Sequence, residues 1–327
     1  MTTVTYIEAI TQALDEEMAR DPRVFLLGED IGLYGGVFKA TKGLQEKYGP
    51  MRVIDTPISE AFIVGGAVGA AMVGMKPVPE IQFSDFITPA MDQIIQQLAK
   101  MRYRTGGNFT APAVVRVCCG AEVGGGLYHS QTNEAWFAGT PGLKVVMPST
   151  PYDAKGLLKA ALRGDDPVIY FEHKRLYRSV KGEVPDGDYT VPIGQAVVRR
   201  PGKDLTIVAY GLMMQKVLES QERLAAAGID AEIIDLRSLL PIDWETIITS
   251  VKKTARVLLV QEAPKSVGVM AEVAARLAEE AFTYLDAPPV RVCGLDVPPV
   301  PFAPPMEHFV LPQPDRIVAA ARDLRAY

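Results

Sequence analysis

Cysteine, histidine and tryptophan are scarce in this chain of 327 residues, which contains three cysteines, three histidines and two tryptophans. The cysteines are Cys118, Cys119 and Cys293. An odd count without C-x-x-C spacing supports neither a disulfide framework nor a zinc site. We therefore expect a protein of a reducing, cytoplasmic setting.

Long apolar runs and a surplus of positive charge are also missing. The longest nearly uncharged run, from Ala61 to Met75, is shorter than the ~18 residues expected of a membrane-spanning helix. The first ten residues lack the charged head and apolar core of a signal peptide. Lys and Arg total 34 against 39 Asp and Glu, for a formal net charge of −5. Neither a membrane nor a nucleic acid is an expected partner.

Several widespread catalytic and nucleotide-binding motifs do not occur. The dinucleotide motif G-x-G-x-x-G and the phosphate-binding motif G-x-x-x-x-G-K-[ST] are absent. Neither G-x-S-x-G nor H-E-x-x-H is present, which removes common hydrolase and zinc-protease signatures. The chemistry of this chain must come from another constellation of residues.

The pattern that is present alternates short β-branched runs with longer helical segments. Expected strands of the first half are 23–27, 78–83, 113–117, 144–147 and 168–171. Thr150, Pro151 and Asp153 predict a capped helix start, and Gly164 its end. A second helix is expected from Thr88-Pro89, with apolar positions Met91, Ile94, Ile95, Leu98 and Met101.

The second half repeats this alternation after a stretch rich in Gly, Pro, Asp and Glu. Its expected strands are 205–210, 231–236, 256–260 and 290–293, and its expected helices 213–227, 243–253, 269–284 and 315–325. Strands that alternate with helices predict parallel sheets. The fold class is therefore α/β, with two doubly wound domains. We expect domains at 1–185 and 204–327, a linker at 186–203, and an extended segment from Pro298 to Pro305.

Two residues stand out as candidates for chemistry. His129 lies in the glycine-rich stretch Gly124-Gly-Gly-Leu-Tyr-His-Ser-Gln131, after an expected strand. Strand ends of α/β sheets face ligand crevices, although a hydrogen-bonded surface histidine has the same pattern. Glu60 opens the apolar run 61–75 behind the helix cap Ser59, where an acid also simply favours the helix dipole. A helix with almost no polar face is expected to be buried all round. His173 is interpreted as a solvated member of a charge cluster, and His308 receives no role.

An ordered set of short segments carries a family resemblance. The segments are Leu27-Gly-Glu-Asp30, Gly35-Gly-Val-Phe38, Asp55-Thr-Pro-Ile-Ser-Glu60, Glu80-Ile-Gln-Phe83, Tyr128-His-Ser-Gln131, Pro141-Gly-Leu-Lys144, Pro148–Gly156 and Glu232–Arg237. In this order the chain resembles the beta subunit of thiamine-diphosphate-dependent 2-oxo acid dehydrogenases, in the transketolase-like superfamily. The forms Leu127-Tyr-His-Ser-Gln131 and Ile81-Gln-Phe-Ser-Asp-Phe86 look most like the branched-chain type.

The resemblance implies a pyrimidine-binding domain followed by a transketolase C-terminal-like domain for assembly and partner docking. Glu60 corresponds to the glutamate that hydrogen-bonds the pyrimidine ring nitrogen of thiamine diphosphate. Phe86 corresponds to the aromatic residue stacked on that ring, with Ile58 and Gln82 completing its pocket. For Phe86 and Ile58, ordinary core packing is an equal alternative. His129 corresponds to the active-site histidine, which also serves acyl transfer to a lipoyl group.

The resemblance also implies partners and metals. The diphosphate and its magnesium belong to a separate alpha subunit in an alpha2-beta2 heterotetramer, and the motif G-D-G of that function is absent here. The lipoyl acyltransferase core is the further partner, and a 2-oxo acid the substrate. A structural potassium site would involve Ala113, Ala161, Leu162, Gly164 and Asp166. Gly164 departs from the acidic residue common there, and Ala138-Gly139 departs where many relatives carry histidine.

Other functions stay open at this point. Pyruvate or acetoin could replace the branched-chain 2-oxo acid. A self-sufficient transketolase-like enzyme is disfavoured by the missing G-D-G. A non-catalytic assembly scaffold has no need of Glu60 or His129, and a plain nucleotide-binding module is disfavoured by the missing fingerprints.

Overall fold

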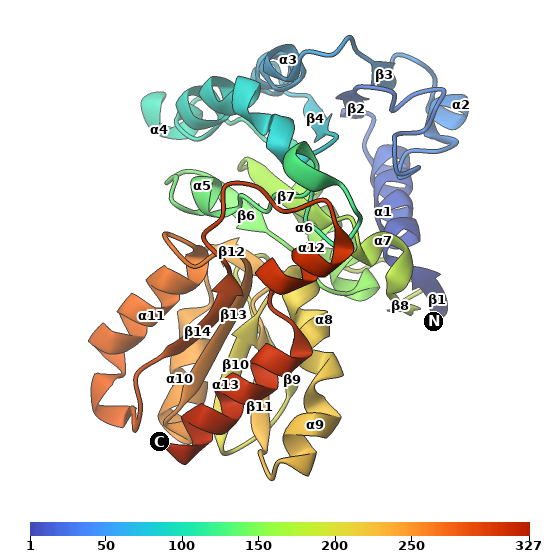
Figure 1. The fold of residues 1–327 in the computed structure, drawn as a ribbon. Coiled ribbons are helices and arrows are strands. Elements are labelled where there is room, and N and C mark those ends of the chain that lie inside the picture. The colour runs from blue at the N-terminus through green and yellow to red at the C-terminus, as the bar shows by residue number, and fades with distance from the viewer. The chain divides into compact units, whose positions relative to one another are not determined.

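The computed structural model describes residues 1–327 as two compact units, each built around its own sheet (Figure 1). Unit 1 comprises Met1–Cys119 and Trp136–Ile193, and unit 2 comprises Gly120–Ala135 and Gly194–Tyr327. The segment 120–135 therefore packs with unit 2, although it interrupts unit 1 in the sequence. The linker expected at 186–203 contains both the end of unit 1 and a strand of unit 2.

Unit 1 has a central parallel sheet whose strands lie in the order β6-β7-β5-β4-β2-β3. These strands are β2 (Val24–Gly28), β3 (Val53–Asp55), β4 (Lys76–Ile81), β5 (Val114–Cys119), β6 (Lys144–Val146) and β7 (Val168–His173). The strands β1 (Thr2–Thr5) and β8 (Lys181–Val184) form a separate antiparallel pair.

The helices of unit 1 are α1 (Tyr6–Arg20), α2 (Leu44–Tyr48), α3 (Glu60–Met72), η1 (Ser84–Ala90), η2 (Gln93–Leu98), α4 (Met101–Arg104), α5 (Ala135–Ala138), α6 (Pro151–Arg163) and α7 (Leu176–Ser179). Of these, α1 packs against α6 and α7, whereas α3 packs against β4, η1 and η2. The predicted cap of α6 is confirmed, because the Asp153 N–H donates to Thr150 Oγ1 at 3.2 Å and Gly164 follows the last turn.

Unit 2 has a five-stranded sheet in the order β14-β13-β10-β11-β9, in which only β9 runs antiparallel to its neighbour. The strands of this sheet are β9 (Val197–Arg200), β10 (Leu205–Ala209), β11 (Ala231–Asp235), β13 (Val257–Pro264) and β14 (Val290–Gly294), and the short strand β12 (Ser238–Leu240) does not belong to it. Together with unit 1, this sheet confirms the prediction of an α/β fold with two mainly parallel, doubly wound sheets.

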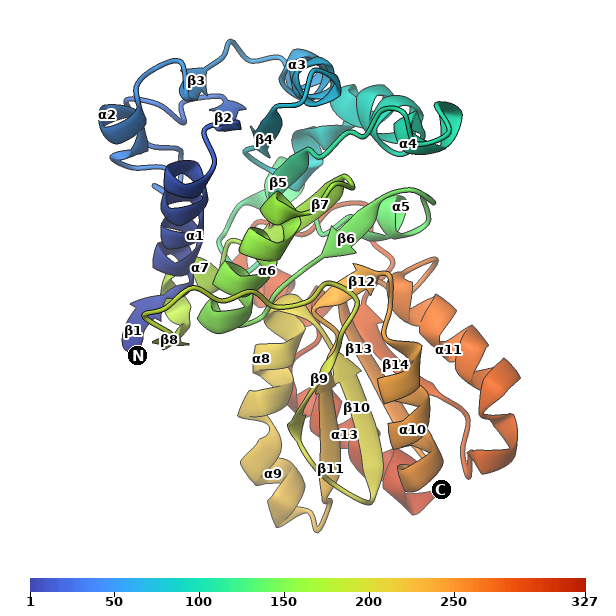
Figure 2. The same ribbon diagram turned by 180° about the vertical axis from the view of Figure 1, so that it is seen from behind.

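Helices cover both faces of the unit 2 sheet. The helices that pack on the sheet are α8 (Gly211–Glu219), α10 (Trp244–Thr254), α11 (Val269–Glu280) and α13 (Pro314–Ala326). The other helices of unit 2 are η3 (Gly126–Tyr128), α9 (Gln221–Ala226), η4 (Phe282–Tyr284) and α12 (Pro304–Val310). α13 lies in front of the sheet in Figure 1, and α10 lies in front of it in the reverse view of Figure 2. None of the helices in either unit combines the length and apolar character needed to span a bilayer.

Three local expectations differ from the structure. The helix expected from Thr88 is broken into η1, the π-helical η2 and α4, because Pro89 has no N–H to donate and Ala99 bonds back to Ile94. The helix α3 is not buried all round in this chain, since Phe62 is 58% exposed. The segment expected to be extended up to Pro305 instead begins α12 at Pro304, where proline suits a first helical turn.

Candidate active site

Three neighbouring strands of unit 1 bring the candidate residues of the first half to one edge of the sheet. Gly28, the last residue of β2, is in register with Asp55 of β3 and with Glu80 of β4. Because parallel strands end at the same edge, the loops that follow β2, β3 and β4 begin side by side.

Glu60 is the first residue of α3, directly behind the cap Ser59, whose Oγ accepts the Phe62 N–H at 3.4 Å. Its side chain is half-buried, and its carboxyl group forms no hydrogen bond or ion pair within the chain. A carboxyl group of this kind is available to an external hydrogen-bonding partner.

Glu29 lies next to this carboxyl group. Burial raises the pKa of Glu29 above its ordinary value, and the nearby carboxylates of Asp30 and Glu60 raise it further. Gln82, which follows β4, donates from Nε2 to the backbone oxygen of Glu29 at 3.1 Å. The structure therefore brings Glu60 and Gln82 together through a residue to which the sequence analysis assigned no role. Its position one residue after a strand end was the signal that could have identified it.

Phe86 is held by an aromatic series within unit 1. Its ring meets Phe83 edge-on at a centroid distance of 5.7 Å, and Phe83 meets Phe38 in the same way at 5.6 Å. Phe86 lies on η1, which packs against the Glu60 helix α3. Such a series fixes the ring orientation and leaves a half-buried aromatic surface near α3.

Ile58 differs from its neighbours in the candidate set because its side chain is 74% exposed in this chain. It lies in the loop between β3 and α3, and the alternative of ordinary core packing is excluded by this exposure. Its role beside the pyrimidine ring stays a prediction.

A buried ionic cluster supports the strand ends beneath Gln82. Arg116 binds Glu172 in a bidentate arrangement, with Nε–Oε1 and Nη2–Oε2 distances of 2.6 and 2.7 Å, and its Nη1 also binds Glu80. All three side chains are at most 5% exposed. Removing one member of such a cluster leaves a buried charge without its partner, so we infer that the cluster fixes the relative positions of β4, β5 and β7.

His129 belongs to unit 2 and is described there by itself. It follows the short helix η3 and is half-buried, whereas the preceding Tyr128 is 67% exposed. A Cβ atom at Gly125 would lie 2.7 Å from the His129 carbonyl oxygen, and a Cβ at Gly126 would lie 2.7 Å from the Phe302 ring. The glycines therefore allow a close turn that determines the backbone position of His129.

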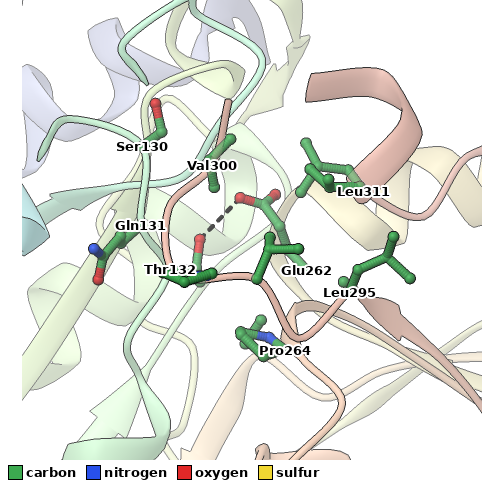
Figure 3. Close-up of a pocket in the computed structure, with 13 residues that line it drawn as sticks. Ser130, Gln131, Thr132, Glu262, Pro264, Leu295, Val300 and Leu311 are labelled. Atoms are coloured by element: carbon green, nitrogen blue, oxygen red, sulfur yellow. Dashed lines mark hydrogen bonds between the residues drawn. The ribbon is translucent and has the colours of Figure 1, made fainter. Parts of the chain in front are cut away.

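A cavity of about 80 Å³ lies beside the same segment in unit 2 (Figure 3). Ser130, Gln131, Thr132 and Glu262 line its polar side, and Leu295, Val300 and Leu311 are among its apolar residues. In the chain as a whole, no group of three or more His, Cys, Asp or Glu side chains has an arrangement that could hold a metal ion.

Glu134 is a buried acid that the sequence analysis missed. Its Oε1 accepts a hydrogen bond from the Tyr210 hydroxyl, and its Oε2 is buried without a hydrogen-bond partner. Burial raises the pKa of Glu134 to about 7, although the hydrogen bond from Tyr210 acts in the opposite direction. No motif marks this residue, because its burial depends on unit 2 residues distant in the sequence.

The interpretation of His173 as a solvated residue was wrong. It ends β7 and is fully buried, and its Nδ1 accepts the Arg175 backbone N–H at 3.2 Å. The adjacent charged residues suggested solvent exposure, but the strand continues through them into the interior of unit 1.

A lysine binds two of the five residues expected to hold potassium. Lys76 Nζ donates to the Leu162 and Gly164 carbonyl oxygens at 2.9 and 3.0 Å. Lys76 is only 5% exposed, and burial lowers its pKa, which Asp165 partly offsets. The ammonium group thus supplies a positive charge at two of the carbonyl oxygens assigned to the ion.

The remaining expected potassium ligands also have partners within unit 1. The Ala113 carbonyl accepts an N–H from the start of β7 at 3.0 Å, and the Ala161 carbonyl accepts one from the end of α6 at 3.2 Å. Asp166 forms ion pairs with Arg102 and Lys144, both at 2.9 Å. Because an ammonium group already lies at two of the expected ligands and Asp166 is paired with two cations, the residues present do not fit a potassium ion, and no step below involves one.

Comparison with protein families accounts for both units. Residues 2–180 match the family described as transketolase, pyrimidine binding domain, and residues 194–317 match transketolase, C-terminal domain. A solved structure described as split gene transketolase, inactive beta4 tetramer, superimposes with a TM-score of 0.79 at 26% identity, covering 99% of this chain and 98% of that one. The fold is thus that of the transketolase class.

Sequence identity to curated relatives indicates which family of this class the chain belongs to. The chain is 54% identical to 2-oxoisovalerate dehydrogenase subunit beta of Bacillus subtilis (strain 168), over 100% of both chains. It is 49% identical to pyruvate dehydrogenase E1 component subunit beta of Acholeplasma laidlawii, over 99% of this chain and 98% of that one. The chain belongs to the family of beta subunits of thiamine-diphosphate-dependent 2-oxo acid dehydrogenases.

The raised pKa of Glu134 predicts a pH-dependent stability. The carboxyl group of Glu134 has a pKa of about 7 in the folded chain and 4.5 in the unfolded chain. Its contribution to the free energy of unfolding is therefore fully present below about pH 4.5 and is lost as the pH rises to about 7. In Glu134→Gln the amide keeps an acceptor for Tyr210 and does not titrate. The variant should therefore gain up to about 3 kcal/mol of stability relative to wild type between about pH 5 and about pH 8. Urea unfolding at both pH values measures this difference, and a pH-independent difference would contradict it.

The Lys76 contacts predict stability without potassium. Replacing potassium by tetramethylammonium at constant ionic strength should leave the melting temperature unchanged. Lys76→Met should lower it by about 5 °C, because two buried hydrogen bonds from a charged group are lost. The control is Lys203→Met, since Lys203 is exposed. A wild-type melting temperature that falls when potassium is removed would show that the site binds the ion after all.

Proposed function

We propose that this chain is the beta subunit of the decarboxylating component of a branched-chain 2-oxo acid dehydrogenase complex. It works with an alpha subunit in an alpha2-beta2 assembly and transfers the acyl group to a lipoyl acyltransferase core. The observation that carries the proposal is the Glu60 carboxyl group, half-buried at the start of α3 and without a partner in the chain. The 54% identity to a 2-oxoisovalerate dehydrogenase subunit, against 49% to a pyruvate dehydrogenase subunit, favours a branched-chain substrate.

The residues at the strand ends of unit 1 suit the aminopyrimidine of thiamine diphosphate. When bound, this cofactor supplies the acidic thiazolium carbon at which a 2-oxo acid is decarboxylated. Glu60 shares a proton with a pyrimidine ring nitrogen and so sets the protonation of the ring. Phe86 packs against the ring from a fixed orientation, and Gln82 and Ile58 border it.

His129 contributes a second proton-transfer group from unit 2. An imidazole donates or accepts a proton near neutral pH, which suits both the substrate carbonyl and acyl transfer to a lipoyl group. The exposed neighbours Leu127 and Tyr128, at 47% and 67%, present this segment to an incoming partner domain.

The chain forms half of an active site in this proposal. It lacks the G-D-G motif of the diphosphate-binding function, so the diphosphate and its magnesium are held by the alpha subunit. The similar solved structure of a split transketolase is described as an inactive beta4 tetramer, which supports the need for a second polypeptide. Three buried free cysteines support a reducing compartment such as the cytoplasm.

The role of Glu60 predicts a specific loss in Glu60→Gln. The assembled variant should still bind thiamine diphosphate, because the amide keeps the size and hydrogen-bonding capacity of the side chain. Hydrogen–deuterium exchange at the thiazolium carbon should slow by at least about 100-fold, because the amide cannot share the required proton. Exchange followed by proton NMR after rapid quenching measures this rate.

The matched control is Glu46→Gln, since Glu46 is an exposed acid in the first turn of another unit 1 helix. Exchange close to the wild-type rate in Glu60→Gln would refute the proposed role. Values of kcat/KM for 2-oxoisovalerate and pyruvate in the wild-type assembly decide the substrate, and a higher value for pyruvate would replace the branched-chain proposal.

A further inference from the structure

The segment that carries His129 is a loop whose two ends are tied together. Gly120 and Gln131 close its base through an N–H···O=C hydrogen bond of 3.0 Å. Such compact loops keep their shape only where side chains or neighbouring elements fix them. The groups that fix this loop therefore determine where His129 lies in unit 2.

Glu262, on β13, binds both ends of this loop with one oxygen atom. Its Oε1 accepts the Ala121 N–H at 2.9 Å. The same atom accepts the Thr132 hydroxyl, also at 2.9 Å (Figure 3). The side chain is only 6% exposed. Burying a carboxylate is costly unless it is hydrogen-bonded, and both of these bonds end on the His129 loop.

Other residues of unit 2 hold the same loop at separate points. Glu307 of α12 accepts the Glu122 N–H at 2.7 Å, and Lys216 and Gln313 bind the Glu122 carboxylate at 3.1 and 3.2 Å. Further along the loop, Phe302 lies against Gly126. Glu262 differs from these contacts because a single acceptor atom, its Oε1, joins the beginning of the loop to its end.

We propose that Glu262 is the positioning residue for His129, and that its carboxylate oxygen holds the two loop ends in the register that places the imidazole for proton transfer. The inference rests on the proposed role of His129. A displacement of about 1 Å at a reacting group can reduce turnover by about 100-fold, so a distant acceptor atom has catalytic consequences.

The first test observes His129 directly in the full chain. The sequence contains only three histidines, so 13Cε1-histidine labelling gives three resonances, which variants at His129 and His308 assign. In Glu262→Ala the His129 signal should shift or broaden, while the signal of the buried His173 stays in place. Glu262→Gln should restore the wild-type position, because its amide oxygen accepts both hydrogen bonds.

The matched control is Glu232→Ala in the same unit. Glu232 is also buried and accepts a backbone N–H from Gly202 and a hydroxyl from Ser250, but it does not contact the loop. An equal shift of His129 in this variant would show general loosening of unit 2 and overturn the proposal. If Glu262→Ala does not fold, Thr132→Val removes one hydrogen bond at nearly constant shape and must displace the His129 signal.

The second test uses the labelled chain assembled with its alpha subunit. In Glu262→Ala, kcat for acyl transfer to a lipoyl domain should fall by at least about 10-fold with KM for the 2-oxo acid nearly unchanged, and Glu262→Gln should recover most of it. Wild-type turnover and a wild-type His129 signal in Glu262→Ala would overturn the proposal. Normal turnover in His129→Ala would instead refute the catalytic role of His129, and the NMR result would still decide whether Glu262 positions it.

Discussion

The parallel register of β3, β2 and β4 is the constraint on which the candidate active site depends. Because Gly28 pairs with both Asp55 and Glu80, the three following loops begin at one level of the sheet. Glu60, Glu29 and Gln82 therefore meet without being close in the sequence. The buried Arg116 cluster, which includes Glu80, fixes the same region from within the sheet. A free carboxyl group at Glu60 is tolerated because the surrounding backbone is held independently of any ligand.

The second unit holds the loop that carries His129 in place. Residues 120–135 follow β5 directly, yet their hydrogen bonds run to β13, α12 and Tyr210 of unit 2. The loop that carries His129 is thus held by carboxylates supplied by the C-terminal half of the chain. Under the proton-transfer role proposed for His129, that half contributes to catalysis.

Local sequence signals predicted the elements well where they act through neighbouring residues. The cap at Thr150 and the β-branched runs fixed the helix and strand positions to within a few residues. The sequence could not reveal Lys76 at the expected potassium site or Glu262 beneath the His129 loop, because both contacts join distant segments. The resemblance indicated Glu60 and Phe86 as site residues. The raised pKa values of Glu29 and Glu134 could not be predicted, because they depend on the burial of these side chains. The high exposure of the Ile58 side chain also depends on the tertiary arrangement of its loop.

In the proposed function, this chain holds only the pyrimidine half of a thiamine diphosphate site. Calorimetry tests this division of the site when thiamine diphosphate and magnesium are titrated first into the purified chain and then into the chain assembled with a G-D-G-bearing alpha subunit. We expect binding no tighter than about 1 mM for the chain alone and about 1 μM for the assembly. Micromolar binding by the chain alone would show that it holds a complete site.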